Sequence, residues 1–250
     1  MLLSILNTGD VGLQPSPEEF LSKIQSLNRA LAKRGIYSKI GRDFRVLKAE
    51  ISRQNLRHNL LNQFDPDGVL NKSKKSFWLC GYAKDGELVS TQAAQLLDLR
   101  RSSVAAYLAK NKMDYVPAAP PVIPKTVRTV HGPRASCLRG RVVYHGEMWL
   151  HPKFRDRGTA HLVVRFGVLC LAYAWNPDAV FGLMNWALAS EGFGVRAGYN
   201  HHEPLTMSWE RKDAPKEHQV WAVYADREDL QFMIDFDSVG FAERISNGFD

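Results

Sequence analysis

The sequence has few cysteines and no long hydrophobic run. Only three cysteines occur in 250 residues, Cys80, Cys137 and Cys170, and none of them belongs to a Cys-x-x-Cys pair. This odd number and wide spacing argue against a disulfide framework and a cysteine-rich zinc site. The most apolar stretch, residues 162–175, contains Arg165 and is too short to cross a bilayer. We therefore expect a protein of the reducing cytoplasm that binds neither a metal nor a membrane.

The N-terminus and the overall composition add to this expectation. Residues 1–20 have no basic region followed by an apolar run, so they do not resemble a signal peptide. Hydrophobic residues make up 45% and charged residues 24% of the chain, proportions that exclude a disordered or collagen-like protein. A chain of 250 residues can form one large domain or two small ones, and we predict a single domain over residues 1–250.

The net charge of +7 is concentrated in one segment. Between residues 99 and 141 there is one acid, Asp114, and nine basic residues: Arg100, Arg101, Lys110, Lys112, Lys125, Arg128, Arg134, Arg139 and Arg141. The local charge is therefore +8, and the rest of the chain is close to neutral. Five prolines in the same segment argue against regular structure after residue 116. We interpret residues 99–140 as a basic, proline-rich insertion, either a solvated loop or a surface for an anionic partner.

Periodicity and turn residues predict an alternation of helices and strands. Ser16-Pro17-Glu18-Glu19 is typical of a helix start, and Gly35 is a plausible end. We expect strands at 44–47, 76–82, 88–97, 141–150, 179–185 and 218–224, and helices at 102–110, 158–175 and 186–197. Residues 226–237 suit a surface helix or a partner contact equally well. This order predicts an α+β or mixed α/β sheet with helices on its faces.

The most informative stretch is residues 146–160, where a strand, a basic turn and an apolar helix follow one another. The first amides of a helix lack partners within the helix and attract anions. Gly158 permits close approach to the backbone, and Thr159 and Ala160 leave the helix start unobstructed. Arg155 and Arg157 can add charge-assisted hydrogen bonds. The pattern predicts a phosphate site that is neither a nucleotide P-loop nor a dinucleotide fingerprint.

Arg155-Asp156-Arg157-Gly158-Thr159-Ala160 resembles the acyl-CoA pyrophosphate loop of the GCN5-related N-acetyltransferase (GNAT) superfamily, an Arg/Gln-x-x-Gly-x-Gly/Ala pattern. Residues 150–155 are similar to the family's lead-in from strand to loop, and Gly198-Tyr199 to its Gly-aromatic signature at a helix end. The resemblance covers a core of residues 76–225. It implies an α/β (α+β mixed sheet) GNAT-like acyl-CoA N-acyltransferase fold, with an N-terminal helix and the basic insertion as additions.

The resemblance also implies a co-substrate and its contacts. Acetyl-CoA or another acyl-CoA would be the donor, and a small-molecule or peptide amine the acceptor. The pantetheine arm would lie between strands 141–150 and 179–185 like an added strand. An amide near Leu150 would polarise the thioester carbonyl. Asn185 would bond the pantetheine arm, although a cap at the strand end is an alternative. The pyrophosphate would lie on Arg155, Asp156, Arg157, Gly158, Thr159 and Ala160.

Glu147 is the candidate general base, since many relatives use a glutamate on this strand. Strand alternation would place it on the face of His145, Trp149 and His151, opposite Leu150. An ion pair with a nearby Arg or Lys is the structural alternative, and His145 or His151 could serve as the base instead. The family's tyrosine acid would fall at Gly194 and is missing, which leaves water or another tyrosine, such as Tyr173, as proton donor.

Two further interpretations remain open. The protein could instead be a polyanion or nucleic-acid binding protein that uses segment 99–141 on a catalytically silent GNAT-like scaffold. His201-His202-Glu203 suggests a metal, but adjacent side chains on a strand point to opposite faces, so we expect no metal site. The oligomeric state and the acceptor are left open by the sequence.

Overall fold

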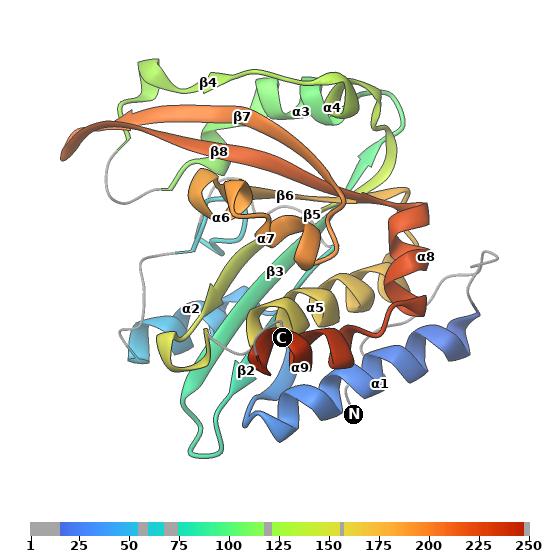
Figure 1. Ribbon diagram of the computed structural model, residues 1–250. Helices are drawn as coiled ribbons and strands as arrows, with labels where there is room; N and C mark the ends of the chain where they lie inside the picture. Colours follow the sequence, from blue (N-terminus) through green and yellow to red (C-terminus); the bar gives the residue numbers. More distant parts are fainter. Residues whose placement is uncertain (1–15, 55–59, 68–74, 118–121, 156–157, 248–250) are drawn as a thin grey trace.

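The computed structural model describes residues 16–54, 60–67, 75–117, 122–155 and 158–247 (Figure 1). The described strands are β1 (Tyr37–Gly41), β2 (Ser76–Tyr82), β3 (Leu88–Leu99), β4 (Arg128–Thr129), β5 (Gly140–Leu150), β6 (Ala179–Asn185), β7 (His201–Arg211) and β8 (Ala214–Asp226). The described helices are α1 (Pro17–Lys33), α2 (Phe44–Gln54), α3 (Val104–Asn111), α4 (Pro133–Cys137), α5 (Thr159–Trp175), α6 (Trp186–Ser190), α7 (Phe193–Arg196), α8 (Arg227–Asp235) and α9 (Ser238–Asn247).

The strands form one eight-stranded sheet in the order β1-β2-β3-β5-β6-β8-β7-β4. Neighbouring strands are antiparallel except β5 and β6, which are parallel. This confirms the predicted mixed α/β sheet. The predicted hairpin of β2 and β3, the strand β5 and the strand β6 are likewise confirmed.

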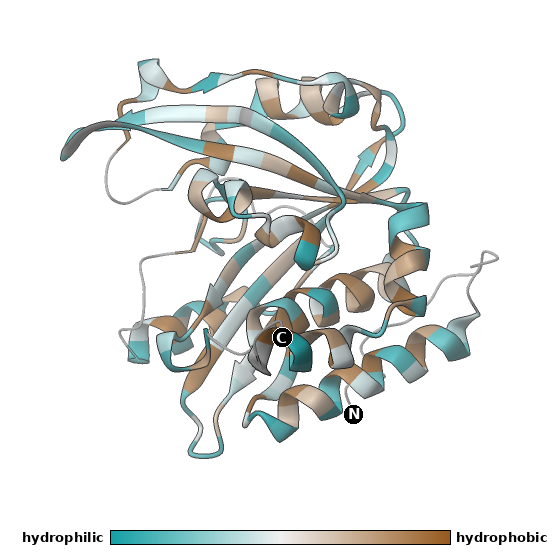
Figure 2. Ribbon diagram, viewed as in Figure 1, coloured by the Kyte–Doolittle hydropathy of each residue, from teal (hydrophilic) through white to brown (hydrophobic). Residues whose placement is uncertain are grey.

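Helices cover both faces of the sheet. Helices α1, α5, α8 and α9 pack on one face, where Figure 1 shows α9 running beside α5. Helices α2, α3 and α4 pack on the other face together with residues 60–64. Figure 2 shows α5 mostly hydrophobic along its length, whereas α1 alternates between hydrophilic and hydrophobic residues. The position of α5 between the sheet and other helices explains this difference, because such a helix is buried on nearly every side.

Local signals account for the ends of the two long helices. Ser16 and Glu19 form a capping box at the start of α1, as the sequence predicts. Helix α5 begins after Gly158, which has the left-handed φ of 69°, and ends at Asn176. Among the described residues, no helix combines the length and apolar character that a membrane span needs.

The predicted strand at 44–47 is wrong, because these residues begin helix α2. Phe44, Leu47 and Ile51 are buried on one side of it, a helical spacing. A short apolar run fits a strand and a helix equally, so the four residues alone were ambiguous. The predicted helix 186–197 is interrupted, since Gly192 has a φ of 73° and separates α6 from α7.

The basic insertion is folded onto the molecule. It contains α3, 3₁₀ turns at Lys112–Tyr115 and Pro124–Thr126, strand β4 and α4. Strand β4 extends the sheet beside β7, and Glu203 of β7 accepts hydrogen bonds from the backbone of Arg134 and Ala135 at the start of α4. Part of the basic charge is neutralised, since Arg100 pairs with Asp98 and Arg134 with Asp226. The described part of the segment is therefore not an irregular loop, although most of its basic side chains are exposed to solvent.

Candidate active site

Strands β5 and β6 are paired at one end only. Their parallel register covers three pairs, of which the last is Tyr144 with Phe181. Strand β5 then continues to Leu150 and β6 to Asn185, each still paired to its outer neighbour, β3 or β8. In the described part of the chain, the inner edges of residues 145–150 and 182–185 thus make no ladder with each other. This is the splayed pair that the resemblance predicts.

A β-bulge shapes β5 beside this opening. Ala93 of β3 pairs with Gly146 and Thr91 with Trp149, so Gln92 faces two residues, Glu147 and Met148. Glu147 has a φ of 54°, which a residue other than glycine adopts rarely. The extra residue changes the alternation of side chains along β5. Glu147 shares a face with Trp149, as predicted, but the prediction that it also shares one with His145 is wrong.

The carboxylate of Glu147 is buried on the face covered by α2. The residue is only 3% exposed, and its Oε1 accepts a hydrogen bond from the backbone N–H of Leu61 at 2.5 Å. The hydroxyl of Thr91 donates to its carbonyl oxygen at 2.8 Å and secures the bulge. Burial and the charge of Glu147 raise the pKa of the neighbouring Tyr144 well above its usual range. The site therefore holds a fixed carboxylate beside a neutral phenol.

The two histidines on either side of Glu147 have other hydrogen bonds. His145 is buried on the α5 face, where its Nδ1 lies 2.5 Å from the Tyr199 hydroxyl and its Nε2 lies 3.0 Å from Oε1 of Gln92. Burial lowers the pKa of His145 to about 4, so the ring is neutral near pH 7. His151 accepts a hydrogen bond from the N–H of Lys153 through Nδ1. Both rings thus have structural contacts, and the role of Glu147 as the base stays a prediction.

Tyr173 lies at the wrong end of α5 to act as the proton donor. Its ring packs on Phe20 of α1, with 6.4 Å between centroids. At the helical rise of about 1.5 Å per residue, it is roughly 21 Å along the axis from the start of α5. Water or another tyrosine as the proton donor stays a prediction.

The first turn of α5 has no side-chain cap, although Thr159 in this turn is only 4% exposed. Gly158 precedes the helix without a side-chain cap, and Thr159 and Ala160 occupy its first positions. Arg155 donates from Nε to the carbonyl oxygen of Leu150 at 2.9 Å, which ties the loop to the end of β5. Asp156 and Arg157, two of the predicted phosphate ligands, lie outside the described residues.

Asn185 caps a helix at the end of β6. Its Oδ1 accepts a hydrogen bond from the N–H of Ala187 at 2.8 Å, at the start of α6. The alternative of a strand-end cap is therefore confirmed. A contact between its amide group and a cofactor stays a prediction.

The sequence analysis missed two residues of the site. Leu61 follows a polar stretch without a recognisable pattern, so its contact with Glu147 had no local signal. Gly182 sits in an otherwise apolar strand, where glycine often marks a close backbone approach. A Cβ atom at this position would lie 3.1 Å from the carbonyl oxygen of His145 on β5. Gly182 is the first β6 residue beyond the paired end and therefore borders the opening.

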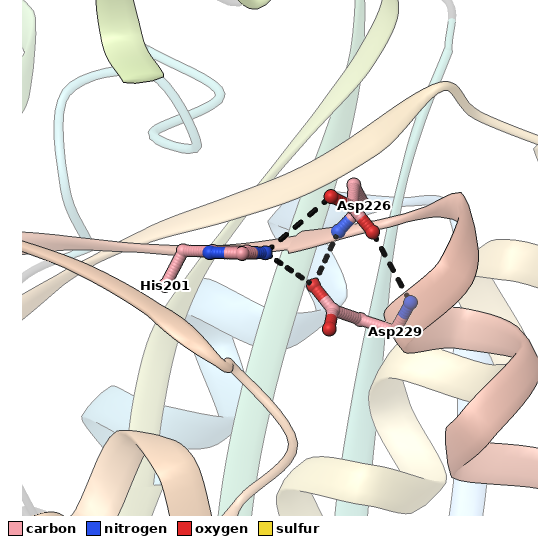
Figure 3. A group of neighbouring side chains, drawn as sticks. All are labelled: His201, Asp226 and Asp229. Atoms are coloured by element: carbon pink, nitrogen blue, oxygen red, sulfur yellow. Dashed lines mark hydrogen bonds and ion pairs between the residues drawn. The ribbon is translucent and has the colours of Figure 1, made fainter. Parts of the chain in front are cut away.

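His201, Asp226 and Asp229 form a cluster away from the opening (Figure 3). His201 lies 3.4 Å from Asp226 and 3.2 Å from Asp229, and the two aspartates form a capping box at the start of α8. Arg134 contacts both His201 and Asp226. The neighbouring His202 points elsewhere, toward the carbonyl oxygen of Tyr199. Arg134 pairs with Asp226, so the cluster connects α4 to β7, β8 and α8.

Comparisons with known proteins find distant structural likeness. No protein-family model and no curated protein matches the sequence. The structure is similar to Arabidopsis thaliana NAA60 in complex with a bisubstrate analogue, at 11% identity, 76% coverage of this chain, 97% of the other and a TM-score of 0.43. It is also similar to TofI in an apo form, at 14% identity, 80% and 97% coverage and a TM-score of 0.42. A GNAT family N-acetyltransferase, YhbS from Escherichia coli in complex with CoA, has 13% identity, 63% and 67% coverage and a TM-score of 0.36.

Proposed function

We propose that this protein is an acyl-CoA-dependent N-acyltransferase that transfers an acetyl group from acetyl-CoA to an amine. The observation that carries this proposal is the opening between β5 and β6, which lies on the strand that leads directly to the start of α5. An extended ligand with amide groups fits the opening, and a phosphate group fits the first turn of α5. Acyl-CoA combines both features in one molecule.

The donor would bind through backbone groups and a helix start. The pantetheine arm would hydrogen-bond to residues 145–150 and 182–185 as an added strand. Its pyrophosphate would lie at the amides of Thr159 and Ala160, where the helix dipole favours negative charge. Asp156, Arg157 and the amide of Asn185 would add contacts, as the sequence motif predicts. Arg155 would hold the loop in place through Leu150.

The residues of β5 can carry out the transfer. The amide near Leu150 would polarise the thioester carbonyl and stabilise the oxyanion. Glu147 would take the proton from the acceptor as its nitrogen attacks the carbonyl carbon. The C–N bond forms, the C–S bond breaks, and the thiolate takes a proton from water. The hydrogen bond from Leu61 keeps the Glu147 carboxylate in one orientation during this step.

The acceptor would approach from the face covered by α2. Glu147 points to that face because of the bulge, and residues 60–64 line its surroundings. The donor phosphates would lie at the start of α5, on the opposite face. The two substrates would thus meet at the opening from opposite sides of the sheet. Small-molecule and peptide amines both suit such a site.

Calorimetric titration with acetyl-CoA tests the proposal. We expect saturable binding to the wild-type protein, followed by thiol release when a panel of amines is supplied. Adenosine 3′-phosphate 5′-diphosphate serves as the matched ligand because it keeps the pyrophosphate and lacks the pantetheine arm. It should bind at least tenfold more weakly, about 1.4 kcal/mol. Absence of acetyl-CoA binding, or equal binding of the two ligands, would overturn the assignment.

A further inference from the structure

A histidine and an arginine side chain are buried on one face of α5. His161 and Arg165 are one turn apart, and their exposed fractions are 7% and 4%. His161 lies in the first turn of the helix, next to the residues proposed to bind phosphate. Residues of these types are seldom buried without a partner, so each needs an explanation.

Several nitrogen atoms of these two side chains have no hydrogen-bond partner among the described residues. Neither ring nitrogen of His161 has a hydrogen-bond partner among the described residues, and the same holds for one terminal nitrogen of Arg165. The other two nitrogens of Arg165 donate to the carbonyl oxygen of Arg196 at 3.1 and 3.0 Å. That partner is neutral, so these bonds leave the guanidinium charge uncompensated. A buried cation without an anion is unfavourable.

The pKa values agree with a surplus of positive charge at this face. Burial, together with the nearby charges of Arg196 and Arg165, lowers the pKa of His161 to about 4. Burial also lowers the pKa of Arg165 to about 10. An anion placed here would reverse both effects.

The C-terminal residues cover this face. The Phe236 ring lies over the Arg165 guanidinium, 4.6 Å from its Cζ atom. Phe241 of α9 lies 6.4 Å from the His161 ring, and Phe193 of α7 lies 5.0 Å from it. A Cβ atom at Gly158 would come within 2.7 Å of the backbone oxygen of Ala242 on α9. The segment 236–242 therefore occupies the space beside the first two turns of α5, as the neighbouring ribbons of α5 and α9 indicate (Figure 1).

We propose that residues 236–242 are a displaceable cover over an anion-binding face of α5 formed by His161, Arg165 and the start of the helix. A phosphate-bearing ligand and the cover compete for this face. The identification of that ligand as the acyl-CoA donor rests on the proposed function, whereas the anion site does not. Because α9 has only ten residues, it is marginal as an isolated helix and depends on this docking. The closed state lowers the apparent affinity by the fraction of molecules that are covered.

Titration of the full chain with inorganic pyrophosphate, followed through the histidine ring signals in NMR spectra, tests the cover. Phe241→Ala removes an aromatic contact of the cover and should bind pyrophosphate at least fivefold more tightly than wild type. The double variant Phe241→Ala/Arg165→Met should lose this gain, because the charge that binds the anion is absent. Equal or weaker binding by Phe241→Ala, or a gain that survives in the double variant, would overturn the proposal.

Hydrogen exchange of the wild-type protein supplies a second measurement if Phe241→Ala does not fold. Pyrophosphate, and separately CoA, should accelerate amide exchange in residues 239–247. Protection of these residues by either ligand would show that α9 completes the site and would overturn the cover. If pyrophosphate accelerates exchange and CoA does not bind, the cover stands and the proposed acyltransferase function fails.

Discussion

The two edges of strand β6 differ in how far they are paired. Its β8 edge is paired along its whole length, from Ala179 with Asp226 to Asn185 with Val220. Its β5 edge is paired only as far as Phe181. Buried backbone groups need hydrogen-bond partners, and on the β8 edge the neighbouring strand supplies them. On the β5 edge that role is left to a ligand or water, which is why we place the function there.

The unpaired edge of β5 that faces β6, here called the open edge, also contains a residue with an unusual backbone conformation. Glu147 adopts a positive φ on β5, a conformation that costs about 1–3 kcal/mol for a residue other than glycine. The hydrogen bonds of Leu61 and Thr91 to Glu147 hold it there. The closed edge is instead reinforced at the end of β8, where Asp226 joins β8 to α8 and pairs with Arg134. The partly paired edge thus carries the proposed site, whereas the fully paired edge is linked to α8 and Arg134.

The largest expected effect is that of Glu147→Gln beside the open edge. The amide oxygen can still accept from Leu61, so the fold should remain, but the side chain can no longer take a proton. We expect kcat to fall by about 10²–10⁴-fold, with acetyl-CoA affinity unchanged. Thiol-release kinetics and calorimetry measure the two quantities.

Glu147→Ala is the structural control for this prediction. It also removes the acceptor of the Leu61 N–H and should lower the free energy of unfolding in urea by about 1–3 kcal/mol. A Glu147→Gln enzyme with wild-type kcat would exclude Glu147 as the base.

Gly182→Val should close the open edge by adding a side chain near the His145 carbonyl oxygen. Overpacking should lower the free energy of unfolding by about 1–3 kcal/mol. Because the added side chain would occupy the opening, we expect acetyl-CoA to bind at least tenfold more weakly, a loss of about 1.4 kcal/mol. Val220→Ile adds bulk beside the closed edge and should leave binding unchanged. Calorimetric titration of both variants with acetyl-CoA measures the two affinities. Normal binding by a folded Gly182→Val protein would show that the ligand does not pass between β5 and β6.

Ala160→Glu places a negative charge in the first turn of α5 and tests whether the donor phosphates bind there. A carboxylate in the first turn of α5 should repel the donor phosphates and weaken acetyl-CoA binding by about 3–10-fold. The same charge interacts favourably with the helix dipole, by about 0.3–1 kcal/mol, so the Tm should not fall for electrostatic reasons. Ala160→Gln is the neutral control of similar size. Equal donor affinities for the Glu and Gln variants would place the phosphates elsewhere.

Asp226→Asn should affect stability at the closed edge and leave donor binding intact. Burial raises the pKa of Asp226. The backbone N–H of Asp229 and the charges of His201 and Arg134 lower it by more, so the net pKa lies below its usual value. A carboxyl with a lowered pKa in the folded state stabilises the protein above its unfolded pKa, and this stability is lost as the pH falls. The free energy of unfolding in urea should therefore differ between wild type and Asp226→Asn at pH 6. The difference should begin to shrink near pH 4 and vanish only below the lowered pKa of Asp226. A difference that persists at low pH would contradict this assignment.

Local sequence signals predicted much of the fold that surrounds the open edge. The capping box of α1, the glycine before α5 and the bounds of β6 depend on neighbouring residues, and the structure confirms them. Strand β7 was not predicted as a separate strand. Its polar start at His201 is held by contacts with Asp226, Asp229 and Arg134, all distant in sequence.

The sequence by itself determined the order of strand, loop and helix from residue 140 to residue 185, and it predicted a phosphate site at the start of α5. Only the tertiary structure decided which way Glu147 points, how far β5 and β6 pair, and that α9 lies over Gly158. The bulge is a property of the pairing between β5 and β3, because two residues of β5 lie opposite one residue of β3. The proposed cover likewise depends on contacts between residues 236–242 and a helix that begins about 80 residues earlier in the chain. Contacts of this kind have no local periodicity, so the packing of distant segments decides them.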